Sequence, residues 1–165
     1  MTRSIDPASP RTWITLGLFI LVVVGVGGLI GSVSIPGPWY EGLTKPPFNP
    51  PNWVFGPVWT TLYVMIAIAG WRIWSLAPKS PAMKLWLAQM GFNWIWSPVW
   101  FVGQLLWPAF AVILVILGLI IAFILAARRV DPVSAWLFVP YAAWVGFASL
   151  LNLSIQVVQA VLKDA

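Results

Sequence analysis

Residues 109–127 read AFAVILVILGLIIAFILAA, a stretch in which no side chain bears a charge or a hydrogen-bonding group. A helix that crosses the hydrocarbon core of a bilayer needs about 20 consecutive apolar residues. Arg128 and Arg129 follow directly and end the run with two charges. The segment therefore predicts a transmembrane helix.

Four further segments are apolar enough to span a bilayer, and proline marks several of their expected ends. Pro57 suits the first turn of the second helix, and Trp107-Pro108 separates the third helix from the fourth. Asp131-Pro132 opens the fifth. We predict an all-α membrane protein, a single domain over residues 1–165, with five transmembrane helices at residues 13–33, 56–77, 83–106, 109–127 and 133–158.

The composition excludes several classes of function. Of all residues, 61% are hydrophobic and 8% are charged, whereas a soluble domain carries charge on about a quarter of its residues. The chain has no cysteine and no histidine, which removes thiol nucleophiles, disulfides and the commonest metal ligand. We therefore expect no metal site and no hydrolytic site. We also expect no ion-coupled transport, because all acidic residues lie outside the predicted helices: Asp6, Glu41, Asp131 and Asp164.

The net charge of +5 indicates orientation rather than nucleic-acid binding, because the basic residues are scattered between apolar segments and form no patch. With five crossings, Lys45 and Lys163 fall on one side of the membrane. The positive-inside rule predicts a cytoplasmic amino terminus. Because an all-helical protein ordinarily occupies a plasma membrane, we expect a multi-pass protein of a bacterial membrane. Seven of the nine basic residues fall on that cytoplasmic side: Arg3, Arg11, Arg72, Lys79, Lys84, Arg128 and Arg129.

The one substantial loop, residues 34–55, reads SIPGPWYEGLTKPPFNPPNWVF. Its prolines remove backbone donors and fix φ, so we expect extended and turn conformations and no regular helix. A plain linker would be polar, but this loop carries large apolar side chains such as Trp39, Tyr40 and Phe48. We predict a structured lid that packs on the helix bundle.

Aromatic and amide side chains share one face of each of three predicted helices. Amides in hydrocarbon need partners, so these faces should point into the bundle, where Asn93 and Asn152 either only bond neighbouring helices or also face a cavity. An aromatic cavity with few polar groups suits a planar apolar ligand. The aligned residues are Phe55, Trp59, Tyr63, Ile66 and Gly70; Gln89, Asn93, Trp96, Ser97 and Trp100; and Tyr141, Trp144, Ala148, Leu151 and Asn152.

Two patterns of small residues suggest close helix packing. Gly27 and Gly31 form a GxxxG motif, and Gly118 begins a ridge that continues through Ala122 and Ala126. Each could form a dimer face, but we expect packing within one protomer. The first helix also has an apolar core longer than the 7 to 15 residues of a signal peptide, so we expect it to be retained as a membrane span.

Three stretches together resemble the TspO/MBR family of tryptophan-rich sensory proteins: WYEGLTKPPFNPPNWVFGPVWTTLY at 39–63, FNWIWSPVWF at 92–101 and VPYAAWVGFASLLN at 139–152. The resemblance implies a five-helix membrane protein, often a homodimer, that binds porphyrins and other flat hydrophobic ligands under the first loop. The ligand-contacting positions it implies are Tyr40, Trp59, Tyr63, Asn93, Trp144, Ala148 and Leu151. Helical spacing adds Phe55 and Trp96 to this predicted site.

Two departures from the family pattern matter. The sterol motif of animal members needs a tyrosine followed closely by lysine or arginine, but no basic residue follows Tyr141 before Lys163, so we do not expect cholesterol binding. The third helix also lacks a small-xxx-small ridge, since Ala88 is followed four residues later by Phe92. The geometry of a homodimer is therefore left open.

The expected function is an intramembrane receptor or regulator that binds tetrapyrroles and needs no cofactor, with membrane lipid around it. Porphyrin, metal-free or as loosely held haem, is the expected ligand, because no histidine or cysteine can ligate iron. Two alternatives stand beside it. One is light-dependent oxidative breakdown of bound porphyrin with Trp59 and Trp144 as redox partners, and the other is transport of tetrapyrroles or lipids through the bundle.

Overall fold

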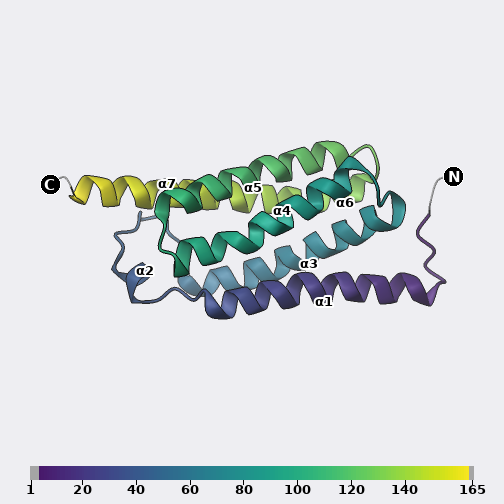
Figure 1. Ribbon diagram of the computed structural model, residues 1–165, viewed down its shortest axis with the longest axis horizontal. Coiled ribbons are helices and arrows are strands. Elements are labelled where there is room, and N and C mark those ends of the chain that lie inside the picture. Colours follow the sequence, from purple (N-terminus) through teal and green to yellow (C-terminus); the bar gives the residue numbers. More distant parts are fainter. Residues whose placement is uncertain (1–3, 164–165) are drawn as a thin grey trace.

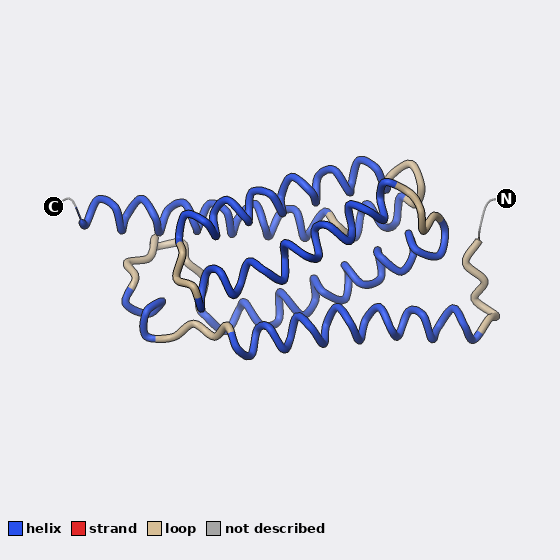
Figure 2. The backbone as a smooth tube through the Cα atoms, in the orientation of Figure 1, coloured by secondary structure: helices blue, strands red, loops and turns tan. Residues whose placement is uncertain are grey.

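Long helices lie side by side along one axis in the computed structural model, which describes residues 4–163 (Figure 1). They are α1 (Pro10–Val33), α3 (Asn52–Leu76), α4 (Pro81–Ser97), α5 (Leu106–Ala127) and α7 (Val139–Lys163). Helix α1 packs on α3, α4 packs on α5, and α5 packs on α7. Within the described residues, only helices and loops are found (Figure 2). The predicted all-α fold is confirmed.

By length and composition, four helical segments of the described chain are suited to cross a membrane: Pro10–Val33, Asn52–Leu76, Leu106–Ala127 and Pro132–Leu162. The α-helical part of α4 has only 17 residues, but a π-helix, η1 (Pro98–Val102), prolongs it. Pro98 has no N–H to give to the preceding turn, and the wider π turn places the Gly103 N–H 2.8 Å from the Pro98 carbonyl oxygen. The structure is thus compatible with five crossings.

The predicted break between the third and fourth helices was misplaced. The chain turns at residues 103–105, where Gln104 adopts a left-handed φ of 54°, and α5 already begins at Leu106. Trp107-Pro108 lies inside the first turn of α5, where a missing proline N–H costs no helical hydrogen bond. Helix α3 likewise begins at Asn52, so Pro57 lies within it and not at its start.

The predicted helix at residues 133–158 is interrupted. A short helix, α6 (Pro132–Leu137), ends at Phe138, and α7 begins at Val139. The physical reason is Pro140, whose ring and missing N–H are incompatible with a continuous helix through Trp136. As predicted, Asp131 caps the start of this segment, accepting a hydrogen bond from the Ser134 N–H.

The loop at 34–55 is structured, but the expectation that it contains no regular helix was wrong. A short helix, α2 (Pro38–Gly42), forms because Pro38 occupies its first turn, where no N–H is required. The Tyr40 side chain is buried and packs edge-on against Phe101, with ring centroids 5.5 Å apart. From α7, the Gln159 side chain donates to the Thr44 carbonyl oxygen at 3.2 Å. The loop therefore forms a lid held to the bundle.

Two glycines allow helices to approach closely inside the protomer. A Cβ atom at Gly27 of α1 would collide with the ring of Tyr63 on α3, and one at Gly70 would collide with the indole of Trp86 on α4. Packing within one protomer is therefore confirmed for Gly27. A Cβ atom at Gly31 or Gly118, by contrast, would meet no atom of the described chain within 4 Å.

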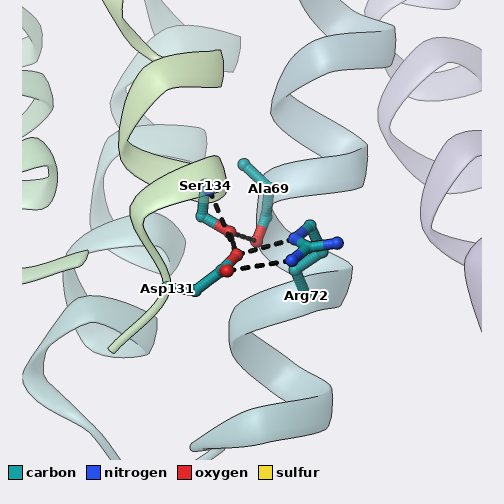
Figure 3. A network of polar contacts seen from close by, with 4 residues as sticks. All are labelled: Ala69, Arg72, Asp131 and Ser134. Atoms are coloured by element: carbon teal, nitrogen blue, oxygen red, sulfur yellow. Dashed lines mark hydrogen bonds and ion pairs between the residues drawn. The ribbon is translucent and has the colours of Figure 1, made fainter. Parts of the chain in front are cut away.

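The end of the bundle that carries the amino terminus is tied together by an ion pair (Figure 3). Arg72 near the end of α3 donates from Nε and Nη2 to the two carboxylate oxygens of Asp131, at 2.6 and 2.9 Å. The Ser134 hydroxyl donates to the same carboxylate at 2.6 Å and lies 3.2 Å from the Ala69 carbonyl oxygen. The hydrogen bond from Arg72 lowers the pKa of Asp131 below its ordinary value. This network joins α3 to α6.

Replacing Asp131 with Asn should destabilise the protein by about 1 to 3 kcal/mol at neutral pH, because the half-buried guanidinium of Arg72 loses its anion. The pKa of Asp131 is depressed on folding, so its contribution is complete above the unfolded value of about 3.9 and is lost as the pH falls through the lower folded pKa. Thermal unfolding in detergent between pH 2 and 7 measures both effects.

The matched control is Arg129→Ala, which removes an exposed cation near the same connection. Wild type should lose stability in acid more steeply than Asp131→Asn. Parallel profiles of stability against pH for wild type and Asp131→Asn would show that the ion pair contributes nothing to stability.

Candidate functional site

A cavity of about 600 Å³ lies beneath the lid, between α1, α3, α4 and α7. Its volume falls in the range of roughly 300 to 1,000 Å³ that is usual for small-molecule sites. The four helices contribute residues of different kinds: mostly glycines from α1, aromatic rings from α3, an amide and an indole from α4, and an indole, an amide and small or aliphatic residues from α7. The cavity therefore has one face of nearly bare backbone and several aromatic faces.

Every residue of the predicted site lines this cavity: Tyr40, Phe55, Trp59, Tyr63, Asn93, Trp96, Trp144, Ala148 and Leu151. Ser97, Trp100 and Asn152, which share the predicted faces, line it as well. Ile66, Gly70, Gln89 and Tyr141 lie further along the same faces and form packing contacts beyond the cavity. The structure thus brings the predicted residues together, while their contact with a ligand remains a prediction.

The aromatic walls are held by contacts between rings, both within one helix and between different elements. Phe55 of α3 meets Trp144 of α7 edge-on, with centroids 5.8 Å apart. Within α3, the ring centroids of Trp59 and Tyr63 lie 5.5 Å apart. Trp96 stacks on Trp100, with an interplanar angle of 10° and centroids 6.1 Å apart. Such contacts fix the orientation of large flat surfaces without long flexible side chains.

A relay of hydrogen bonds joins three helices at the inner end of the cavity. The Tyr63 hydroxyl donates to Asn93 Oδ1 at 3.1 Å, and Asn93 Nδ2 donates to the Tyr141 hydroxyl at 2.7 Å. Tyr141 then donates to Gln89 Oε1 at 3.1 Å. Asn93 therefore bonds neighbouring helices and also faces the cavity, which is the second of the two alternatives for this residue.

Several polar atoms of lining residues are buried and lack a partner within the described chain: Ser34 Oγ, Trp96 Nε1, Trp144 Nε1 and Asn152 Oδ1. The Asn152 amide N–H bonds only the carbonyl of Ala148 on its own helix, at 3.1 Å. Buried polar groups normally have partners, because leaving one unpaired costs free energy. These unpaired donors and acceptors therefore lie in residues of the cavity wall.

Sequence reasoning missed one wall and part of the roof. Glycines carry no side chain whose periodicity could mark a cavity face. The loop has no regular period, so its sequence does not show which of its residues face the cavity. The missed lining residues are Val24, Gly27, Gly28 and Gly31 of α1; Ser34, Ile35, Pro36 and Asn49 of the loop; and Asn52, Trp53, Gly56 and Thr60 of α3, with Phe101 of η1 and Ile155 of α7. The GxxxG motif was the only available signal, and it was assigned to packing.

The helices and the cavity define a helical membrane protein with an internal chamber large enough for a small molecule. A family model described as the TspO/MBR family matches residues 18–158. The chain belongs to the TspO/MBR family.

Curated relatives agree with this assignment. The tryptophan-rich sensory protein of Cereibacter sphaeroides is 36% identical over 137 residues, which cover 83% of this chain and 87% of the relative. The translocator protein of Ovis aries is 36% identical over 149 residues, covering 85% and 87%, and that of Homo sapiens is 34% identical over 135 residues, covering 77% and 80%. Family membership supports a multi-pass membrane receptor or regulator, and these relatives' names designate no enzyme.

Replacing Asn93 with Leu should lower stability by about 1 to 2 kcal/mol, because the hydroxyls of Tyr63 and Tyr141 both lose a partner in hydrocarbon. Asn152→Leu is the matched control, since this amide bonds only its own helix. Thermal unfolding in detergent should rank Asn93→Leu clearly below Asn152→Leu. Equal losses would contradict an interhelical role for the relay.

Proposed function

We propose that this protein is an intramembrane receptor that binds porphyrins and similar flat hydrophobic molecules in the lidded cavity. The observation that carries the proposal is the combination of a 600 Å³ chamber with aromatic walls contributed by three helices. Each offset aromatic contact contributes about 0.5 to 1.5 kcal/mol beyond area burial, so three or four of them together with burial support micromolar affinity.

The lid accounts for the carboxylates that natural porphyrins carry. No charged side chain of residues 4–162 lines the cavity, which disfavours buried propionates. Lys45 lies in the lid with its ammonium 4.6 Å from the ring centroid of Tyr40, and Tyr40 lines the cavity. We infer that the macrocycle lies among the indoles and that its propionates point toward Lys45.

Metal-free porphyrin is the preferred ligand over tightly ligated haem. Tyr40 and Tyr63 are the only lining residues, among those described, of a type that ligates haem iron. Both hydroxyls already bond asparagine side chains, at 3.4 and 3.1 Å. Iron ligation by either tyrosine would have to break one of these bonds, so haem would be held loosely. The proposed receptor needs no cofactor.

Light-dependent breakdown of bound porphyrin is the second candidate, favoured by Trp59 and Trp144 at the cavity wall, where an excited macrocycle could exchange electrons with an indole. A defined product formed only in light identifies that activity, and porphyrin flux across liposomes identifies transport. Binding with neither result supports a receptor.

Membrane orientation and assembly complete the proposal. The connections α3–α4 and α5–α6, which carry Lys79, Arg128 and Arg129, lie at the same end of the bundle as the amino terminus (Figure 1). We propose that this end is cytoplasmic in a bacterial membrane. The glycine ridge that begins at Gly118 supports a homodimer contact in lipid, because Gly118 is exposed on α5.

A dark titration of the purified protein with protoporphyrin, followed by tryptophan quenching, tests binding. Wild type should saturate in the micromolar range, and Trp144→Phe and Trp59→Phe should each weaken binding about threefold to tenfold by removing one aromatic contact. Trp136→Phe is the matched control, because this indole is 73% exposed and lies outside the cavity. Equal, non-saturating quenching in all four proteins would mean that porphyrin only partitions into detergent, and the proposal would fail.

A further inference from the structure

The walls of the cavity differ in exposure. No lining residue of α4, η1 or α7 is exposed. Trp96, Ser97, Phe101 and Trp144 are half-buried, and the others have at most 7% of their surface exposed: Asn93, Trp100, Ala148, Leu151, Asn152 and Ile155. Lining residues of α1 and α3 include six that are exposed: Gly28, Gly31, Asn52, Trp53, Gly56 and Thr60. The cavity is therefore closed on the α4 and α7 side and open on the α1 and α3 side.

The opening follows from the order of residues along two neighbouring helices that run in opposite directions. Gly27 of α1 packs against the ring of Tyr63 on α3 and closes the contact between them. One turn nearer the lid, α1 presents Gly31, and α3 presents Thr60 and then Gly56. None of these has a side chain large enough to fill the space between two helices. The contact therefore opens on the lid side of Gly27.

The space at this opening is empty of other protein atoms within the described chain. A Cβ atom built at Gly28, Gly31 or Gly56 would meet nothing within 4 Å. The close approach of α1 and α3 therefore does not require glycine at these three positions, unlike at Gly27. Packing within the protomer therefore does not explain the glycines at these positions, whereas the passage of a molecule would require small residues there.

The surface around the opening is apolar. Leu29, Val33 and Ile35 flank it on the α1 side and are 71%, 72% and 67% exposed. Residues of this kind on a membrane helix face lipid chains. In the lid at the adjacent end, Tyr40 is only 5% exposed. Ser34, which also lines the cavity, is 4% exposed, and its hydroxyl has no partner in the described residues.

We propose that ligands enter and leave the cavity sideways, from the hydrocarbon of the bilayer, through an opening between α1 and α3. This α1–α3 portal is formed by Gly28, Gly31, Gly56 and Thr60. The inference deepens the proposed function and rests on it for the class of ligand, which is a flat molecule dissolved in the membrane. It predicts that access depends on the portal residues and does not require the lid to open.

The absence of native cysteine makes a direct test of access possible. Ala148→Cys places a single thiol on the closed wall opposite the portal. In proteoliposomes, a neutral bilayer-soluble maleimide should label this thiol faster than a charged, membrane-impermeant thiol reagent of similar intrinsic reactivity. Adding Gly31→Phe, or Gly56→Phe from the facing helix, should slow labelling by the bilayer-soluble reagent at least tenfold.

Gly25→Phe is the matched control, because Gly25 is an exposed α1 glycine with open space around it that does not line the cavity. Labelling should be unchanged in this variant, and thermal unfolding should show that all variants fold. Equal labelling rates in Gly25→Phe and both portal variants would overturn the proposal. Faster labelling by the charged reagent would also overturn it, by showing a route from water.

Stopped-flow mixing with protoporphyrin separates this inference from the proposed function. In Gly31→Phe, both the association rate and the dissociation rate should fall, because the same portal serves for entry and for exit. Absence of saturable binding to wild type would refute porphyrin binding, while the labelling rates would still decide whether the portal exists.

Discussion

The hydrogen-bonded relay from Tyr63 through Asn93 and Tyr141 to Gln89 is the constraint on which the site depends. Hydrocarbon provides no water to satisfy a buried amide or hydroxyl, so each of these groups must find its partner in the protein. Because the relay joins α3, α4 and α7, it fixes how each helix is rotated about its axis. That rotation turns the indoles of Trp59, Trp96 and Trp144 toward one space.

On the lid side of the relay, contacts between the lid and the helices enclose the cavity. The lid is held over it by the packing of Tyr40 on Phe101 and by the hydrogen bond from Gln159 to Thr44. Below the relay, the Arg72–Asp131 ion pair joins α3 to α6 at the far end of the bundle. The chamber therefore lies in the half of the bundle that contains the lid, with rigid polar contacts on three helices and bare glycine backbone on the fourth.

Sequence reasoning found what hydrophobicity and helical periodicity encode. The membrane helices and the aromatic faces follow from apolar length and from spacing of three and four residues, and every predicted site residue lines the cavity. The sequence did not predict how three prolines alter the helices, because the effect of a proline depends on its position relative to the helix ends. Pro140 interrupts the last segment, Pro98 produces a π-helix, and Pro38 starts a helix within the lid. The α1 wall was missed because glycine contributes no side chain to a pattern.

The central claim is that a flat hydrophobic molecule occupies the chamber between α3 and α7 beneath the lid. A structure of the protein in lipid nanodiscs with protoporphyrin, prepared in the dark, tests it most directly. The macrocycle should lie against Trp59 and Trp144 with its carboxylates toward Lys45. Porphyrin found only on the lipid-facing surface of the bundle, with the chamber free of it, would contradict the claim.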